Sequence, residues 1–282
     1  MLTIDKVYSA KNVLKKVIRK TSVIPAFDLS DTNHIYLKTD NLQRTGSFKI
    51  RDSYFKISRL TEEEKARGII ASSAGNHAQG VALAAQQEGI KCTICMPDNA
   101  PISKIEATKS YGAEVCLAQG AYDEAYALAA KMAEEKGYTF VHPYDDEDVI
   151  AGQGTIGLEI LEDLDSVDAI VVPIGGGGLI SGVAFAAKSM KPDIKIYGVQ
   201  AAGAPSMYRS FHEGKQITLD TANTFADGIA VKHPGDIPFE IVSNYVDDIF
   251  TVTEDEIAAS ILTLLEKQKV VAEGAGAVSV AA

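Results

Sequence analysis

Lys49 is the residue of this sequence whose neighbours most suggest covalent chemistry. It lies in the segment RTGSFKIR (residues 44–51), between two apolar side chains and two residues after Ser47, a residue type that often caps helices. Burial, the positive end of a helix and the neighbouring Arg51 would each lower the pKa of its amine. A lysine with a lowered pKa can act as a Schiff-base nucleophile, although most lysines are solvated surface residues.

A run of four glycines, Gly175, Gly176, Gly177 and Gly178, is the strongest candidate for an anion site. It follows the apolar run DAIVVPI and precedes the helical pattern LISGVAFAAKSM. Unshielded backbone amides at a helix N-terminus can surround an oxyanion. No Gly-Lys-Ser/Thr follows, which excludes a P-loop. A tight turn alone needs one or two glycines, so four favour a phosphate cradle.

Two other segments could also approach an anion. Ser73-Ala74-Gly75-Asn76-His77 follows the apolar run GIIAS, and its small residues leave backbone amides accessible. Asn76 could donate to a ring oxygen or could simply cap a helix, and a lone histidine such as His77 is more often structural than catalytic.

The third segment, Gly152 to Gly157, matches the dinucleotide fingerprint G-x-G-x-x-G literally. It follows the acidic stretch DDEDVIA rather than an apolar strand, which the fingerprint requires. These glycines are therefore interpreted as helix-packing positions, with a Rossmann dinucleotide binder kept as an alternative.

Strands and helices alternate along the chain and would position these segments. Unbroken apolar runs separated by helical patterns predict a parallel α/β sheet covered on both faces. Ligands of such sheets bind at the carboxyl ends of the strands. Strands are expected at residues 68–72, 90–96, 113–117, 138–141, 168–172, 194–199 and 248–252.

Composition limits the classes of function. The chain has 282 residues, 46% of them hydrophobic, and a net charge of −11, which argues against nucleic acid and anionic membranes as partners. Three cysteines and the lack of a long apolar run favour a cytoplasmic protein. Cys92 and Cys95 lie in a predicted buried strand and should face opposite sides, so neither a redox pair nor a metal site is expected.

Taken together, the segments resemble a known family. LKTDNLQRTGSFKIR, SSAGNHAQGVAL, AGQGTIGLEI, VPIGGGGLISG and VVAEGAGA are similar, in order, to the fold-type II pyridoxal-phosphate enzymes. Within that family they resemble the threonine dehydratase (threonine deaminase) and serine racemase group. The resemblance implies a two-lobed α/β fold like that of the tryptophan synthase β-subunit, with parallel or mostly parallel sheets flanked by helices.

The resemblance also implies a role for each motif. Lys49 would be the catalytic residue and would form the Schiff base with pyridoxal 5'-phosphate (PLP), with Phe48 beside the cofactor ring. The residues Gly175, Gly176, Gly177 and Gly178, with the amide of Leu179, would hold the phosphate. Asn76 would bond the ring hydroxyl. Ser73, Ala74, Gly75, Asn76 and His77 would receive the substrate carboxylate.

The implied reaction is β-elimination of L-threonine, and secondarily of L-serine, to a 2-keto acid and ammonia, with Lys49 taking the Cα proton. The partners expected are an amino-acid substrate and further copies of the chain, in a dimer or tetramer. One alternative is a serine or hydroxyaspartate dehydratase with racemase activity. An alternative of another class is a catalytically silent module that binds PLP or an amino acid.

Three departures from the family pattern refine this expectation. Ala74 stands where the racemase has a second serine, which disfavours racemisation because alanine carries no exchangeable proton. Gln200 and Ser206 stand where the racemase has cation-binding carboxylates, so no metal is expected. The family's K-I-R-G-A reads Lys49-Ile50-Arg51-Asp52-Ser53 here.

Two lobes are expected from the resemblance. Residues 1–52 and 147–282 would form a discontinuous PLP-binding lobe, and residues 53–146 a smaller lobe that closes on the substrate, with the boundary in the acidic loop 142–149. The family continues to a closing strand and a Ser/Thr/Cys-Gly-Gly-Asn segment that the 282 residues lack. The chain is therefore expected to be a fragment.

Overall fold

The computed structural model describes residues 2–282, which form two compact units. One unit comprises residues 9–20 and 43–143, and the other comprises residues 2–8, 21–42 and 144–282. The division at 143/144 lies in the acidic loop, and residues 43–52 group with residues 53–143. Lys49 is therefore in the unit of residues 43–143, whereas the family resemblance implies that residues 1–52 belong with residues 147–282.

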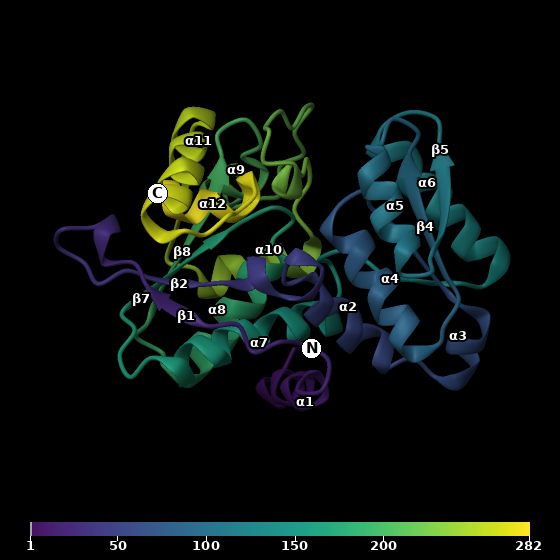
Figure 1. The fold of residues 1–282 in the computed structure, drawn as a ribbon, viewed down its shortest axis with the longest axis horizontal. Coiled ribbons are helices and arrows are strands. Elements are labelled where there is room, and N and C mark those ends of the chain that lie inside the picture. Colours follow the sequence, from purple (N-terminus) through teal and green to yellow (C-terminus); the bar gives the residue numbers. More distant parts are fainter. Residues whose placement is uncertain (1) are drawn as a thin grey trace. The chain divides into compact units, whose positions relative to one another are not determined.

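The unit of residues 43–143 is built on a four-stranded parallel sheet in the order β5-β4-β3-β6. Its helices include α4 and α6, labelled in Figure 1. The elements are β3 (Ile69–Ser72), β4 (Cys92–Pro97), β5 (Glu114–Ala118) and β6 (Thr139–Phe140), with α2 (Lys49–Ser58), α3 (Glu62–Arg67), α4 (Asn76–Glu88), α5 (Ile102–Ser110) and α6 (Tyr122–Lys136).

Both faces of this sheet are covered, as the apolar strands predict. Residues of α2 and α4 pack with Ile69, Ala71 and Ile94 in one core cluster, and residues of α6 pack with Ile70 and Cys95 in a second. Cys92 belongs to the first cluster and Cys95 to the second. The prediction that these two cysteines face opposite sides is thus confirmed, and burial raises the pKa of each thiol to about 12.

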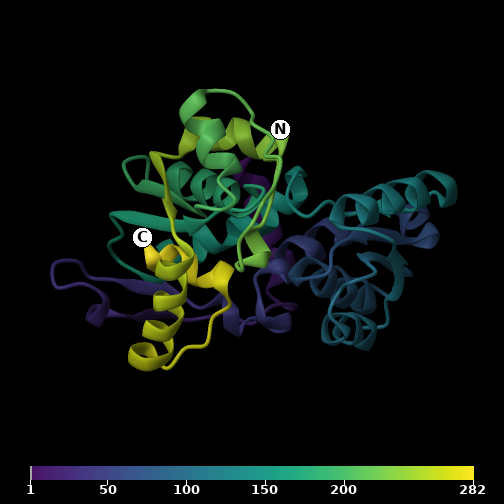
Figure 2. The ribbon, with the colours of Figure 1, turned by 90° about the horizontal axis from the view of Figure 1, so that it is seen from above.

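The other unit contains a three-stranded parallel sheet in the order β7-β8-β9. Helices α11 and α12 pack beside each other, drawn in yellow in Figures 1 and 2. The elements are β7 (Ala169–Pro173), β8 (Lys195–Ala201) and β9 (Asp248–Val252), with α7 (Glu147–Asp163), α8 (Gly178–Met190), α9 (Ser206–Glu213), α10 (Asp236–Tyr245), α11 (Glu254–Thr263) and α12 (Gly274–Ala281).

A short antiparallel hairpin, β1 (Val23–Pro25) with β2 (Tyr36–Lys38), completes the strands and was not expected from the sequence. Helix α1 (Ile4–Leu14) precedes it, and single 3-10 turns cover Phe27–Leu29, Asp40–Leu42, Arg44–Gly46 and Asp227–Ile229. A π-helical turn, Leu264–Gln268, follows α11. All seven predicted strands are present within a few residues of the expected bounds, and the expected parallel α/β fold is confirmed.

The glycines of the segment 152–157 lie inside α7 and pack it against α8. A Cβ atom at Gly154 would lie 2.9 Å from the carbonyl oxygen of Gly182, and one at Gly157 would lie 2.9 Å from that of Val183. Only residues without a side chain allow the two backbones to come this close. The interpretation of these glycines as packing positions is confirmed.

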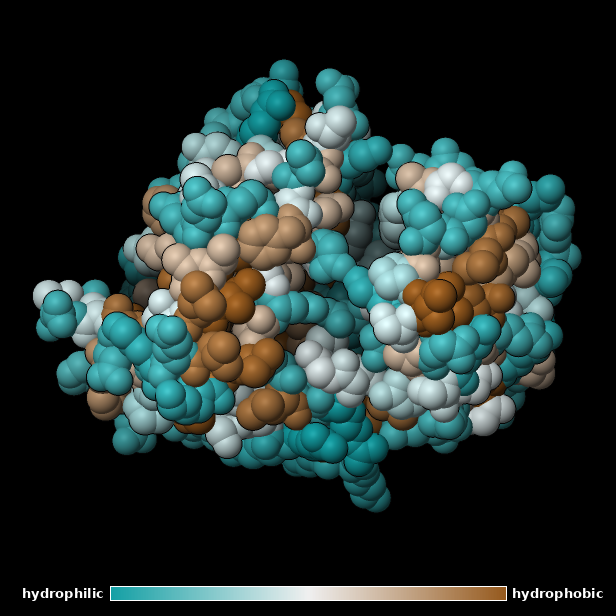
Figure 3. All heavy atoms as spheres, turned by 45° about the horizontal axis from the view of Figure 1, so that its top comes forward, coloured by the Kyte–Doolittle hydropathy of each residue, from teal (hydrophilic) through white to brown (hydrophobic). Residues whose placement is uncertain are grey.

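Hydrophilic residues predominate on the face drawn in Figure 3, with apolar groups between them. Large apolar side chains that are exposed include Ile102, at 78%, and Val271, at 74%. Within residues 2–282, no helix has the length and apolar character that a bilayer span requires.

Candidate active site

Lys49 is the first residue of α2. The residue at the N-cap position is Phe48, without a side-chain cap, so the prediction that Ser47 caps this helix is wrong. Ser47 is extended and its buried hydroxyl has no hydrogen-bond partner. The helix begins one residue later than expected because the tight turn Arg44–Gly46, with Thr45 at φ 65°, ends directly before Ser47.

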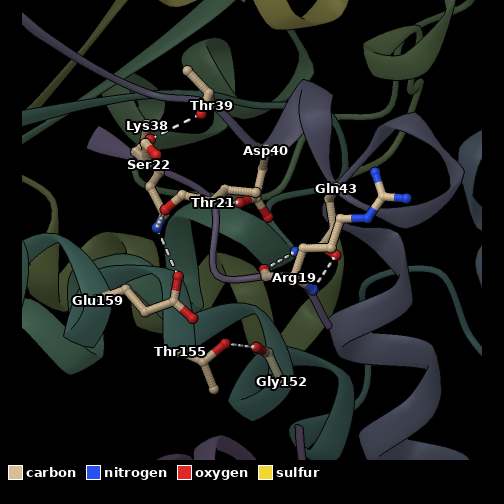
Figure 4. A network of polar contacts seen from close by, with 10 residues as sticks. All are labelled: Arg19, Thr21, Ser22, Lys38, Thr39, Asp40, Gln43, Gly152, Thr155 and Glu159. Atoms are coloured by element: carbon tan, nitrogen blue, oxygen red, sulfur yellow. Dashed lines mark hydrogen bonds and ion pairs between the residues drawn. The ribbon is translucent and has the colours of Figure 1, made fainter. Parts of the chain in front are cut away.

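A buried glutamine fixes the chain just before this turn. The side chain of Gln43 accepts from the amide of Arg19 at 2.8 Å and donates to its carbonyl at 2.6 Å, as a neighbouring β-strand would (Figure 4). The same Gln43 oxygen accepts from the amide of Arg44. These bonds hold the segment that leads to Lys49.

The amine of Lys49 is largely buried and has polar partners. Its Nζ donates to the carbonyl of Pro143 at 2.5 Å and lies 3.6 Å from a carboxylate oxygen of Asp52. It also lies 5.2 Å from the centre of the Phe48 ring. Burial lowers the pKa of Lys49, as predicted, while Asp52 acts in the opposite direction.

The segment Ser73–His77 joins β3 to α4, and α4 packs directly on the start of α2. A Cβ atom at Gly80 would lie 2.7 Å from the carbonyl oxygen of Lys49, so glycine is needed for this contact. Ala74 packs against the apolar core. The hydroxyl of Ser73 accepts from the amide of Gly75, which bends the loop into a compact turn.

His77 is buried and uncharged. Its Nε2 lies 3.0 Å from the carbonyl oxygen of Val141, so this nitrogen carries the proton and Nδ1 is an acceptor. Burial and the charge of Lys49 hold the pKa of His77 well below its usual value. Its Nδ1 and the hydroxyl of Ser72 are buried without a hydrogen-bond partner.

The four glycines occupy the turn between β7 and α8. The carbonyls of this turn are all engaged: Gln200 donates to those of Ile174 and Gly175, the amide of Gly235 donates to Gly176, and that of Ser181 donates to Gly177. In a planar peptide the N–H points opposite to the C=O. Each amide of residues 175–178 therefore points away from the group that the carbonyl of the same peptide binds.

Side chains are excluded from this turn. Gly177 has φ +99°, which favours glycine, and a Cβ atom at Gly178 would lie 2.6 Å from the side-chain oxygen of Gln153. A side chain at Gly176 would overlap the ring of Tyr144. The first amides of α8, including that of Leu179, have no acceptor within the helix. The turn is thus a cradle of amides at a helix N-terminus, which suits a phosphate.

The predicted site residues fall into two groups. Lys49, Phe48 and the segment 73–77 lie in the unit of residues 43–143, and the segment 175–179 lies in the other unit. Two residues not expected from the sequence also contact the site: Asp52 lies beside Lys49, and Gln200 binds the glycine turn. The i,i+3 spacing of Asp52 from Lys49 could have indicated their contact, but nothing in the sequence connects Gln200 to a turn 25 residues earlier.

A sequence profile for the family described as pyridoxal-phosphate dependent enzymes matches residues 14–282. The chain belongs to this family. It is 55% identical, over 284 aligned residues, to an L-threonine ammonia-lyase of Thermotoga maritima, covering all of this chain and 71% of that protein.

Two solved structures of this family resemble the fold over nearly the whole chain. Maize serine racemase superposes with a TM-score of 0.96 at 36% identity, covering 99% of this chain and 85% of its own. The processed threonine deaminase isoform 2 of Solanum lycopersicum superposes with a TM-score of 0.93 at 39% identity, covering 98% and 83%. The predicted fold-type II architecture is confirmed.

The residues present fit the family's cofactor. PLP needs an amine for its aldehyde and donors for its phosphate. The buried amine of Lys49 and the amide cradle at 175–178 supply groups of these two kinds, and the buried polar atoms of Ser72 and His77 have no partner within the protein. Among residues 2–282 no group of three or more possible metal ligands gathers.

Proposed function

We propose that the chain is a PLP-dependent ammonia-lyase that converts L-threonine, and secondarily L-serine, to a 2-keto acid and ammonia. The relative of 55% identity, which matches the whole chain and is named an L-threonine ammonia-lyase, carries this proposal. The buried lysine with a lowered pKa and the glycine cradle support it, because they are the groups that the reaction requires.

Lys49 would hold the cofactor and act as the base. When bound, PLP withdraws electrons from the substrate's Cα and so makes the Cα proton acidic. The freed amine of Lys49 would accept that proton, and burial favours the unprotonated form that can do so. The carbonyl of Pro143 orients the amine by accepting its hydrogen bond.

The other predicted residues would bind and orient. The amides of Gly175, Gly176, Gly177, Gly178 and Leu179 would hold the phosphate. Phe48 would lie beside the ring and Asn76 would donate to the ring oxygen. The segment Ser73–His77 would bind the substrate carboxylate, with His77 remaining neutral because of its burial.

The residue Ala74 favours elimination over racemisation. Ala74 packs against the core and has no group that could give or take a proton. A racemase needs such a group on the second face of Cα. The serine racemase likeness therefore supports the shared fold and cofactor, and the alternative of a serine or hydroxyaspartate dehydratase/racemase is tested by the chirality of recovered substrate.

Cytoplasmic location and self-association into a dimer or tetramer are further parts of this proposal. The first follows from the cysteine usage and the second from the family resemblance. A small-molecule amino acid as substrate agrees with the named relatives.

The reaction itself is the test. The protein is incubated with PLP and L-threonine, L-serine or their D-enantiomers, and the keto acid and remaining substrate are quantified by chiral chromatography. We expect keto acid from L-threonine at the highest kcat/KM and no D-threonine. The variant Lys49→Ala should lose this activity, whereas Lys56→Ala, on the same helix, should keep it. Absence of keto acid with PLP bound would overturn the proposal in favour of a silent binding module.

A further inference from the structure

A fully buried carboxylate lies beside the amine of Lys49. Asp52 is in the first turn of α2, three residues after the lysine, and its side chain is 0% exposed. Residues three apart share one face of a helix, so the two side chains leave the backbone in the same direction. The carboxylate oxygen Oδ2 lies 3.6 Å from Nζ of Lys49.

Two features of its surroundings favour negative charge on Asp52. The hydroxyl of Ser53, which is also fully buried, donates to Oδ1 at 2.9 Å. A carboxylate in the first turn of a helix is further stabilised by the helix dipole. Asp52 and Ser53 are the two positions at which the chain departs from the K-I-R-G-A pattern.

Neighbouring residues hold the backbone at the start of α2. Gly80 of α4 contacts the backbone of Lys49 directly, and Gln43 holds the chain that precedes it. The side chains of Lys49 and Asp52 can therefore separate only by a change of rotamer. A buried ion pair has a large effect on both partners because the surroundings screen it weakly.

The titratable neighbours leave Asp52 as the carboxylate that acts on Lys49. From α4, His77 faces the lysine, and its pKa is held low, so it adds no charge. His142, after β6, acts on His77 in turn. On α2 itself Asp52 raises the pKa of Lys49 against the larger effect of burial, and the cation Arg51, directly before Asp52, is also fully buried.

We propose that Asp52 is a positioning residue for Lys49: its carboxylate holds the free lysine amine across the first turn of α2 and sets the pH at which that amine is available. This inference rests on the proposed function, since it concerns the same lysine. A protonated amine cannot attack the cofactor's aldehyde, so Asp52 slows the return of Lys49 to the cofactor. The same ion pair makes Lys49 a stronger base toward the Cα proton.

The test measures the titration of Lys49 in the protein without cofactor. Trace acetylation with acetic anhydride at a series of pH values, followed by peptide mass spectrometry, gives the midpoint at which Lys49 becomes reactive. The exposed Lys131 is the internal reference. We expect Asp52→Asn to move the Lys49 midpoint down by about one pH unit, a tenfold change in the fraction of free amine. Ser53→Ala should move it less.

One control variant and one replacement variant complete the test. Glu62→Gln removes the exposed acidic member of an i,i+3 pair with Lys65 and should leave Lys49 unchanged. If Asp52→Asn does not fold, the double variant Asp52→Gly with Ser53→Ala restores the Gly-Ala pair of the family pattern and should show the same downward shift.

The outcomes for Asp52 and for the proposed function are separate. The pH dependence of PLP loading, followed by absorbance, should shift in parallel with the acetylation midpoint. Equal midpoints in the wild type and Asp52→Asn, or a higher one in the variant, would overturn the role of Asp52 even if both load PLP. Failure of the wild type to load PLP on Lys49 would overturn the proposed function, while the acetylation midpoint would still report on Asp52.

Discussion

At the scale of single residues, burial decides the charge state of the candidate site. In water, a lysine or histidine side chain is cationic when the pH is below its pKa. Burial lowers the pKa of both Lys49 and His77 here. A neutral histidine beside a lysine avoids the repulsion that two buried cations would produce. Burial thus favours the unprotonated amine of Lys49, which is the form that acts as a base or nucleophile.

His77 gives a prediction for acid stability. Its native pKa lies well below the usual value, so between the two values the unfolded chain binds more protons than the native chain. The free energy of unfolding should therefore fall below about pH 6.5, by up to about 1.4 kcal/mol per pH unit from this group.

The test compares the wild type with His77→Gln, whose side chain retains a donor for the carbonyl of Val141 but does not titrate. Urea unfolding at pH 7.5 and 5.5 should show a smaller loss of stability in the variant. An identical loss in both proteins would contradict the assignment of a neutral buried His77.

At the scale of elements, the β7–α8 turn depends on hydrogen bonds made by its carbonyls. Gln200 of β8 is fully buried and donates to the carbonyls of Ile174 and Gly175, while its own oxygen accepts from the amide of Tyr208. A carboxylate in place of the Gln200 amide would present an oxygen to those carbonyls instead of a donor. Gln200 thus belongs to the support of the cradle.

The variant Gln200→Glu should therefore weaken PLP binding. Losing the donor and placing a carboxylate against two carbonyls should raise the Kd for PLP roughly tenfold or more, the equivalent of about 1.4 kcal/mol. Titration followed by absorbance or fluorescence measures this. Gln87→Glu, at an exposed position of α4, adds the same charge and should leave the Kd unchanged. Equal affinities for the two variants would refute the role given to Gln200.

The contact between α7 and α8 leads to a second prediction, on stability. Gly154→Ala would place Cβ 2.9 Å from the carbonyl oxygen of Gly182, and overpacking of this kind costs about 1–3 kcal/mol of stability. Gly276→Ala in α12 meets only Ala272, at 3.6 Å, and should be neutral or stabilising by up to about 1 kcal/mol. Chemical denaturation compares them, and a stabilising Gly154→Ala would contradict the packing described.

At the scale of the whole molecule, a carboxylate network contributes to stability at neutral pH. Asp247 lies 2.7 Å from Lys188 of α8 and 2.8 Å from Lys195 of β8, and accepts from the amide of Ile196. Burial alone would raise the pKa of Asp247, but the hydrogen bonds from Lys188, Lys195 and Ile196 outweigh it and hold the pKa well below its usual value.

A lowered carboxylate pKa stabilises the native state above the unfolded value of about 3.9, and this stability is lost as the pH falls. Asp247→Asn should lower the free energy of unfolding at pH 7 by about 1–2 kcal/mol. The difference from the wild type should shrink progressively below pH 4. A difference that is constant with pH would show that the variant acts through packing instead.

The buried ion pair between Lys38 and Glu159 is a comparable link, from β2 to α7. Lys38 Nζ lies 2.7 Å from Glu159 and also donates to the carbonyl of Thr21, as Figure 4 shows. Both side chains are less than a tenth exposed. Such a pair orders the chain around the short hairpin, whose strands have little regular pattern of their own.

The sequence predicts the sheets well because local patterns determine them. Apolar runs between helical segments located all seven strands of the two parallel sheets, and the glycines of 152–157 were recognised as packing positions because no strand precedes them. The β1–β2 hairpin was missed because its three-residue strands are partly exposed and show no alternation.

Features that depend on distant partners could not be predicted in the same way. Ser47 looks like a helix cap in the sequence, but the turn at Thr45 moves the helix start to Lys49. The contact of Gln200 with Ile174 joins β8 to the turn that follows β7 and leaves no trace in either local pattern. The roles of Lys49, Phe48, Asn76 and the cradle residues remain predictions from the resemblance.

The most direct test of the central claim traps the cofactor on its lysine. The protein is mixed with PLP, its visible absorption band is recorded, and the sample is reduced with borohydride and digested for mass spectrometry. We predict a phosphopyridoxyl group on the peptide that contains Lys49, and none in Lys49→Ala. A folded protein that gives no adduct, or an adduct on another lysine, would contradict the account.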